Sequence, residues 1–224
     1  MKKILIPVTN HATLGDTDKA NGTYSPELTH AVHVFMDHGV DYDIASIKGG
    51  KAPIYGTDIE EDAVNTSVLG DENFQNRINN TIPVSQLNIE DYDAVFYPGG
   101  FGLLSDLVTN EDFAKLSATH YDNGGILGAV CHGPGAFLPI KLRSGESLLA
   151  NKSVTSFTRE EEIDYETIDD IPFLVEESLT RHAAKFSKVK PWQEFVIVDE
   201  RVITGQNPAS AQAVGKAIVD LLAV

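Results

Sequence analysis

The chain has 224 residues, of which 42% are hydrophobic and 22% are charged, and this composition excludes wholesale disorder. Its net charge is -16, from 33 acidic and 17 basic residues, so binding to nucleic acid or to an anionic membrane surface is disfavoured. The length suits one α/β domain with a sizeable core, and we expect residues 1–224 to form it.

The cysteine count and the start of the chain favour a cytoplasmic location. A single cysteine excludes an intramolecular disulfide and fits a reducing compartment. The apolar run of MKKILIPV is too short for a signal peptide, and no run approaches the length of a membrane span. We therefore expect a cytoplasmic protein that binds no membrane.

Strands and helices are predicted to alternate along the chain. Ser25 is placed to cap the first helix, with Pro26 at its first position and Glu27 in its first turn. In chain order we predict a strand at Lys3–Val8, a helix from Pro26 to about His38, strands at Tyr42–Ile47 and Ala94–Tyr97, a helix from Asn110 to about Asp122, strands at Ile126–Val130 and Ser153–Phe157, a helix at Pro172–Leu179, a hairpin of Phe195–Val198 and Arg201–Thr204, and a helix at Ala209–Leu222. The alternation predicts a flavodoxin-like α/β fold, with a doubly wound, mostly parallel sheet and helices on both faces.

The segment 49–80 lacks a long periodic element. It contains a Gly-Gly-Lys-Ala-Pro turn, an acidic patch and a polar run. Such a pattern is typical of short helices in an insertion, not of a second domain.

The chain is organised around the stretch GGILGAVCHGPGAF at 124–137. Ile126–Val130 is typical of a strand buried on both faces, and Cys131 follows it where the strand must turn into a helix. Ala129 and Gly133, two residues on either side of the cysteine, provide the small side chains that a nucleophile elbow needs. A position at the start of a helix would favour the thiolate over the thiol. The alternative is that Cys131 is an inert buried residue.

Three predicted strands bring unusual residues to the carboxyl edge of the sheet, where such folds bind ligands. The first strand leads to Glu27, the third to Gly99 and Gly100, and the fourth to Cys131 and His132. The amides of Gly100 and His132 could form an oxyanion hole for a thiolate adduct. The glycine pair alone is also typical of a simple tight turn.

Several acidic residues are candidates for proton transfer. Glu27 beside a thiolate would hold its proton toward neutral pH, because two adjacent anions cannot both stay charged cheaply. The alternative is an acid that complements the dipole of the first helical turn. His132 needs an orienting carboxylate, for which Glu160, Glu161 and Glu162 are candidates, although adjacent acids are more often a solvated surface.

The sequence favours neither a metal nor a nucleotide cofactor. His30 and His33 lie three residues apart on the predicted first helix, but no third ligand with recognisable spacing accompanies them. The chain contains no Walker loop, no dinucleotide-binding glycine motif after a strand and no cysteine cluster. We therefore predict a protein without a cofactor or a bound metal.

Five motifs together carry a resemblance to a known family. They are GTYSPELTH at 22–30, YPGGFG at 97–102, NGGILGAVCHGP at 123–134, SVTSFTREEE at 153–162 and TGQNPASA at 204–211. With them the chain resembles, nearly end to end, the ThiJ/PfpI superfamily, whose members are related to class I glutamine amidotransferases. The most similar branch contains heat-shock chaperones and glutathione-independent glyoxalase III enzymes.

The resemblance implies a role for each candidate residue. It implies Cys131 as the nucleophile, with His132 as its neighbour in the active site. It implies Glu27 as the proton-transferring carboxylate. The amides of Gly100 and His132 are implied as the oxyanion donors.

The resemblance also leaves one choice open and has two departures. The third triad acid matches Glu162 best, with Glu161 as the alternative. Phe101 stands where the family has a histidine in its G-G-H-G turn, which would change the polarity or the substrate preference of the pocket, and Ala31 stands where a proline is usual. True glutaminases of the wider superfamily have a late His-x-Glu pair, and no histidine of this sequence is followed by a glutamate two positions later. Glutamine hydrolysis is therefore disfavoured.

By this resemblance the chain is a cofactor-free enzyme that converts methylglyoxal, or a similar small 2-oxoaldehyde, into a 2-hydroxy acid such as D-lactate. Cys131 would form a hemithioacetal, and Glu27 would move a proton through an enediol. Two alternatives are a stress-responsive holding chaperone with Cys131 as an oxidation sensor, and a deglycase of protein or nucleotide adducts. Members of the family commonly pair, so we expect a homodimer.

Overall fold

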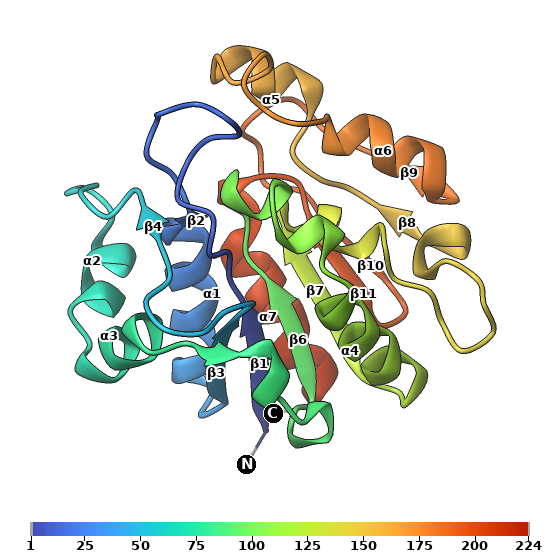
Figure 1. Ribbon diagram of the computed structural model, residues 1–224, viewed down its shortest axis with the longest axis horizontal. Helices are drawn as coiled ribbons and strands as arrows, with labels where there is room; N and C mark the ends of the chain where they lie inside the picture. Colours follow the sequence, from blue (N-terminus) through green and yellow to red (C-terminus); the bar gives the residue numbers. More distant parts are fainter. Residues whose placement is uncertain (1, 224) are drawn as a thin grey trace.

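A computed structural model describes residues 2–223 and places a seven-stranded sheet at the centre of the molecule (Figure 1). The strands of this sheet are β1 (Lys3–Pro7), β3 (Asp41–Ser46), β5 (Ile82–Pro83), β6 (Ala94–Tyr97), β7 (Ile126–Val130), β10 (Val196–Asp199) and β11 (Val202–Gly205). Their order is β10-β11-β7-β6-β1-β3-β5, and every neighbouring pair is parallel except the hairpin β10–β11. The predicted α/β class with a mostly parallel sheet is confirmed.

Helices cover both faces of this sheet. They are α1 (Ser25–Asp37), α2 (Ala63–Leu69), α3 (Glu72–Asn79), α4 (Glu111–Asp122), α5 (Arg159–Asp164), α6 (Val175–His182) and α7 (Ala211–Leu222). Figure 1 shows α7 behind the sheet and α4 in front of it. Within residues 2–223, no helix has both the length and the apolar character that crossing a membrane requires.

Two apolar cores result from the alternation of side chains along each strand. Ile4 and Ile6 of β1 belong to a core that includes buried residues of α1 and α7. Leu5, between them, belongs to a second core that includes Phe113 of α4. Because both faces are covered, central strands such as Ile126–Val130 are buried along their whole length and read as continuous apolar runs.

The first helix begins one residue earlier than predicted. Tyr24 holds the capping position and makes no side-chain cap, so the expected cap at Ser25 is wrong. The Ser25 hydroxyl instead donates a 2.6 Å hydrogen bond to the amide oxygen of Asn65 in α2. Further along α1, Ala31 lies against Gly215 of α7, where an added Cβ would lie 3.1 Å from the Ala31 Cα. Small residues therefore allow these two helices to approach closely.

The predicted insertion 49–80 contains short elements, as expected. They are β4 (Ile54–Tyr55), α2 and α3. Strand β4 pairs in parallel with β2 (Thr23–Tyr24), so that Tyr55 lies beside Tyr24 at the start of α1. The insertion thus contributes a side chain next to the carboxyl edge of the sheet. The assignment of 1–224 to one domain stays a prediction.

The predicted strand Ser153–Phe157 is wrong beyond its first two residues. Only β8 (Ser153–Val154) is a strand, and it pairs with β9 (Lys185–Phe186) outside the main sheet. The chain then turns toward the ends of the central strands, where the Phe157 amide donates a 2.9 Å hydrogen bond to the Cys131 carbonyl. The apolar character of this segment therefore serves contacts beside Cys131, not strand pairing.

Candidate active site

Cys131 lies directly after β7. The carboxyl end of this strand is at the edge of the sheet opposite the chain termini (Figure 1). The Cys131 φ of 59° falls in the left-handed region, which a residue with a side chain seldom adopts without support from its surroundings. At Gly133, an added Cβ would lie 2.3 Å from the Tyr97 carbonyl oxygen, so no side chain fits there. The nucleophile-elbow prediction depends on these two features: a strained cysteine, and a small residue two positions later where no larger one fits.

The expectation that Cys131 rests as a thiolate at the start of a helix is wrong. The cysteine precedes a five-residue 3-10 helix (Gly133–Phe137), which is too short to supply a helix dipole of useful strength. Its side chain is 4% exposed, and burial together with the nearby Glu27 carboxylate raises the pKa of the Cys131 thiol well above its usual range. This shift favours the thiol over the thiolate, so a reaction of the sulfur calls for a base.

Glu27 shares a confined space with this sulfur. The carboxyl group comes from the first turn of α1 and is fully buried, so it is not a solvated acid at a helix end. At Gly99, an added Cβ would lie 2.3 Å from Glu27 Oε2 and 2.7 Å from the Cys131 Cβ. Both side chains therefore pack over the bare backbone of Gly99, and only glycine leaves room for them.

The environment of Glu27 favours its protonated form. Burial raises the pKa of Glu27 to about 8, and the Cys131 thiol and the Gly99 amide oppose only part of that rise. Neither carboxyl oxygen accepts a hydrogen bond of normal geometry from the described residues. Glu27 is thus a buried carboxyl group with free oxygens whose proton affinity is close to neutral pH, which suits reversible proton transfer.

His132 and Glu162 complete a chain of contacts from the sulfur. Cys131 Sγ lies 3.2 Å from His132 Nδ1, and His132 Nε2 lies 2.7 Å from Glu162 Oε1. The Thr167 hydroxyl donates a 2.5 Å hydrogen bond to the other Glu162 oxygen. If Nε2 carries the proton that it donates to the carboxylate, Nδ1 is left free to accept the proton of the thiol.

The three adjacent glutamates of α5 have different surroundings. Glu162 contacts His132, whereas Glu161 accepts a 2.9 Å hydrogen bond from the Thr158 backbone amide in a capping box. Glu160 is at the surface and forms an ion pair with Lys188. The structure therefore brings Glu162, and not Glu161, to the histidine.

The amides proposed as oxyanion donors are free of other partners. Among residues 2–223, no backbone carbonyl accepts a hydrogen bond from the amide of Gly100 or of His132. Gly100 has a φ of 105°, and an added Cβ would lie 2.4 Å from the Gly22 carbonyl oxygen. The turn therefore requires glycine for conformational and steric reasons, and it leaves both amides available.

A cavity of about 60 Å³ opens onto the sulfur. Phe101, at the position of the family histidine, packs its ring on His132 with a centroid distance of 4.5 Å. The phenyl ring at this position makes the cavity wall apolar beside His132. The residues that line the cavity are Tyr24, Tyr55, Phe101, Cys131, His132, Phe157, Tyr165, Trp192 and Pro208.

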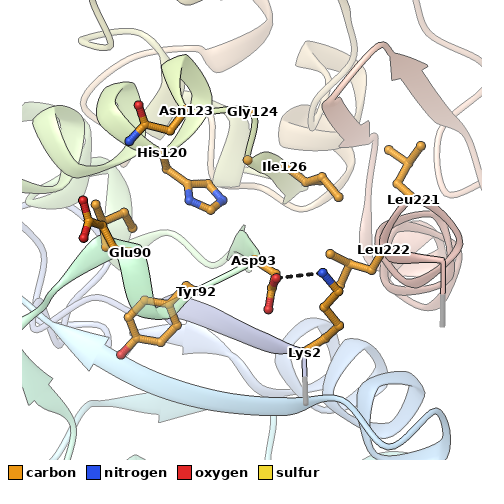
Figure 2. Close-up of a pocket in the computed structure, with 12 residues that line it drawn as sticks. Lys2, Glu90, Tyr92, Asp93, His120, Asn123, Gly124, Ile126, Leu221 and Leu222 are labelled. Atoms are coloured by element: carbon orange, nitrogen blue, oxygen red, sulfur yellow. Dashed lines mark hydrogen bonds and ion pairs between the residues drawn. The ribbon is translucent and has the colours of Figure 1, made fainter.

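A second cavity, of about 440 Å³, lies at the opposite edge of the sheet (Figure 2). Its walls come from the starts of the central strands and from the end of α7, and Lys2 and Asp93 form a 2.9 Å ion pair in it. Burial lowers the pKa of His120, which favours its neutral form. None of the predicted site residues lines this cavity.

The sequence analysis missed most of the aromatic wall. Tyr24 and Phe157 lie inside two of the motifs that carry the resemblance, so their positions were a usable signal. Tyr55, Tyr165 and Trp192 lie in segments without such motifs, and nothing local indicates that they line the same cavity as Cys131.

The two histidines considered as metal ligands have other partners. His30 Nε2 lies 2.8 Å from an Asp62 carboxylate oxygen, and His33 Nε2 lies 3.4 Å from an Asp37 oxygen. Across the described range 2–223, no three histidine, cysteine, aspartate or glutamate side chains are grouped to hold a metal ion.

Residues 19–221 match the DJ-1/PfpI family. The chain belongs to this family. The resemblance drawn from the five motifs is thereby confirmed over almost the whole chain. The matched range includes the segments that carry Glu27, Cys131, His132 and Glu162.

Curated members of the family include enzymes similar to this chain. Glyoxalase 3 of Candida albicans is 30% identical, with 94% of each chain covered. The glutathione-independent glyoxalase HSP31 of Saccharomyces cerevisiae is also 30% identical, with 99% of this chain and 98% of the relative covered. These names agree with the branch that the motifs indicated.

Solved structures have the same fold. Rapid encystment protein 24 kDa of Francisella tularensis is 35% identical and superposes with a TM-score of 0.94 over 99% of both chains. Glyoxalase III of Candida albicans is 27% identical and superposes with a TM-score of 0.86, covering 98% of this chain and 96% of that one.

Proposed function

We propose that this chain is a cofactor-free, glutathione-independent glyoxalase. It converts methylglyoxal, or a similar small 2-oxoaldehyde, and water into a 2-hydroxy acid, with D-lactate as the product from methylglyoxal. The names of relatives that align along nearly their whole length support this activity. The observation that carries the proposal is the packing of the Cys131 side chain and the Glu27 carboxyl group over Gly99.

The first step is addition of the sulfur to the aldehyde. His132 Nδ1, 3.2 Å from Sγ, takes the thiol proton as sulfur bonds to C1, while Glu162 stabilises the resulting imidazolium. The aldehyde oxygen becomes an oxyanion, which the amides of Gly100 and His132 stabilise. Protonation of that oxygen gives a hemithioacetal on Cys131.

The second step moves a proton between two carbons. Glu27, as the carboxylate, removes the proton from C1 to give an enediolate and then returns it to C2, while the proton of the C1 hydroxyl passes to the C2 oxygen. The C1 oxygen becomes the carbonyl of a thioester. Water attacks this thioester with His132 as the base, and the 2-hydroxy acid leaves as Cys131 recovers its thiol. The sum is addition of one water to the 2-oxoaldehyde, so no external oxidant or reductant is needed.

The direct test is formation of D-lactate from methylglyoxal by the purified protein in buffer without glutathione, measured with a stereospecific lactate assay. We expect D-lactate from the wild-type protein and none above background from Cys131→Ala, because the variant lacks the only sulfur nucleophile that this mechanism uses. Equal rates in the two proteins would refute the proposal.

Two further expectations belong to the same proposal. The family resemblance favours a homodimer, and the single cysteine favours a cytoplasmic enzyme. Light scattering of the purified protein tests the first, and a monomer at micromolar concentration would contradict it.

A further inference from the structure

Trp192 is a feature of the cavity that the proposed chemistry does not use. It is the only tryptophan in the chain, it lines the cavity above Cys131, and its side chain is 42% exposed. Its φ of 65° is left-handed, which is an outlier for so bulky a residue. Such strain persists only where surrounding contacts enforce it, and it concentrates at functional sites.

A buried carboxylate enforces this conformation. Glu161, which is fully buried, accepts a 2.9 Å hydrogen bond from the Trp192 amide and a 2.8 Å hydrogen bond from Asn207 Nδ2. Asn207 Nδ2 also donates to the Gln193 carbonyl at 2.8 Å, and Gln206 Nε2 donates to Glu161 at 3.1 Å. The motif TGQNPASA thus contributes two amide side chains that fix the segment carrying Trp192, and Glu161 is the neighbour of the triad acid.

Aromatic contacts position the indole ring over the cavity. Its centroid lies 5.6 Å from that of Phe157, in an edge-on arrangement, and 6.1 Å from that of Tyr165. Tyr165 in turn stacks on Phe101 at 5.9 Å, and Phe101 packs on His132. The indole Nε1 donates to Asp164 at 3.3 Å. The outer wall of the cavity is therefore a connected set of rings attached to α5.

The ring itself is not required by the fold in an evident way. Glu161 binds the backbone amide of residue 192, which any residue except proline would supply. A side chain with 42% exposure contributes less to the core than a fully buried one. The indole is a large ring in the wall of the cavity that Cys131 also lines, and this cavity has a volume of about 60 Å³. By comparison, a cavity of about 150 Å³ is known to hold benzene.

We propose that Trp192, fixed by Glu161 and Asn207, sets an upper limit on the size of the substituent that a 2-oxoaldehyde can carry into the site. This inference rests on the proposed function and specifies its substrate class: a methyl substituent fits below the indole, whereas a phenyl substituent requires the indole to move. Trp192 is in this sense a specificity-determining residue, and it takes no part in the proton transfers.

The first experiment compares methylglyoxal with phenylglyoxal in glutathione-free buffer. We expect Trp192→Ala to raise the ratio of kcat/KM for phenylglyoxal to that for methylglyoxal by about tenfold or more, since pocket contacts of this kind are worth about 10- to 200-fold in discrimination. Trp192→Phe, which keeps a smaller ring, should give an intermediate ratio. Val198→Ala removes an exposed apolar side chain that does not line the cavity, and its ratio should equal that of the wild type. A wild-type ratio in Trp192→Ala would overturn the proposal.

The second experiment does not depend on glyoxalase turnover. Because the chain has one cysteine, the rate of its alkylation can be followed by intact mass with iodoacetamide and with the bulkier N-benzyl iodoacetamide. Trp192→Ala should react faster with the benzyl reagent relative to the small one, and Val198→Ala should not. If lactate formation is absent but the alkylation ratio changes, the proposed function fails and the size limit stands. If lactate forms and neither ratio changes, the size limit alone fails.

Discussion

The two edges of the central sheet hold cavities of opposite character. At the amino edge, about 440 Å³ is enclosed by residues such as Lys2 and Asp93, which neutralise each other in an ion pair (Figure 2). At the carboxyl edge, about 60 Å³ opens onto Cys131, beside Glu27, for which the described residues provide no hydrogen-bond partner of normal geometry. The larger space contains this ion pair and one histidine, His120, whose pKa burial lowers, whereas the smaller one brings a thiol and a carboxyl group together and burial raises the pKa of both. The pairing of a nucleophile with a proton acceptor, and not the volume, indicates where reaction is possible.

The topology explains why the reactive groups gather at one edge. In a parallel sheet the carboxyl ends of β1, β6 and β7 meet, so the segments after them bring Glu27, Gly99 and Cys131 together from distant parts of the chain. At the amino edge the strands begin, and their loops are tied down by ion pairs such as Lys2 with Asp93. The predictions below test this difference between the edges.

A large effect is expected at the acid that orients His132. A glutamine at position 162 can donate its amide hydrogen to His132 Nε2, which would place the ring proton on Nδ1 and prevent that atom from accepting the thiol proton. We expect Glu162→Gln to lower kcat with methylglyoxal by about 10²-fold or more. The matched control is Glu160→Gln in the same helix, which is exposed and should keep wild-type kcat. Equal kcat values in a folded Glu162→Gln protein and in the wild type would show that the contact is only structural.

The pH dependence of the reaction should follow Glu27. The carboxylate is the form that removes the C1 proton, and burial raises the pKa of Glu27 to about 8. Below that pH the protonated fraction increases, so kcat/KM for methylglyoxal should fall about tenfold per pH unit below about 8 and level off above it. Initial rates between about pH 6 and about pH 9 measure this profile. A profile that is flat across this range would exclude Glu27 as the base with this proton affinity.

The smallest effect is expected at the amino edge. Glu90 is a glutamate that lines the larger cavity, so it is a suitable control for Glu27. Glu90→Gln should leave both kcat and KM for methylglyoxal at their wild-type values. A loss of activity would mean that the larger cavity takes part in the reaction, and the contrast between the two edges would be broken.

The sequence predicted much of the fold because its signals are local or carried by motifs. The strand before Cys131 and the hairpin near the C-terminus are visible as apolar runs, and both exist in the structure. Ser153–Phe157 looked the same as these runs, but its last residues pack beside Cys131 instead of pairing in the sheet. A local pattern does not distinguish apolar residues that pair in a sheet from those that line a cavity.

The site could be predicted only in part, because a local pattern does not show where a side chain points or how deeply it is buried. The sequence favoured Glu162 and left Glu161 possible, and the direction of each side chain from α5 separates the one that contacts His132 from the one that fixes Trp192. The protonation of Cys131 was predicted with the wrong sign because burial depth, which decides it, depends on packing from several distant segments. Trp192 reaches the cavity through such packing and left no local signal.

The central claim is that Glu27 and Cys131 act as one reacting pair. The most direct measurement is kcat for lactate formation from methylglyoxal, without glutathione, by Glu27→Gln and Glu90→Gln prepared in parallel with the wild type. Loss of a positioned acid–base group predicts that kcat of Glu27→Gln falls by about 10² to 10⁴-fold while Glu90→Gln is unaffected. A folded Glu27→Gln protein with wild-type kcat would contradict the account.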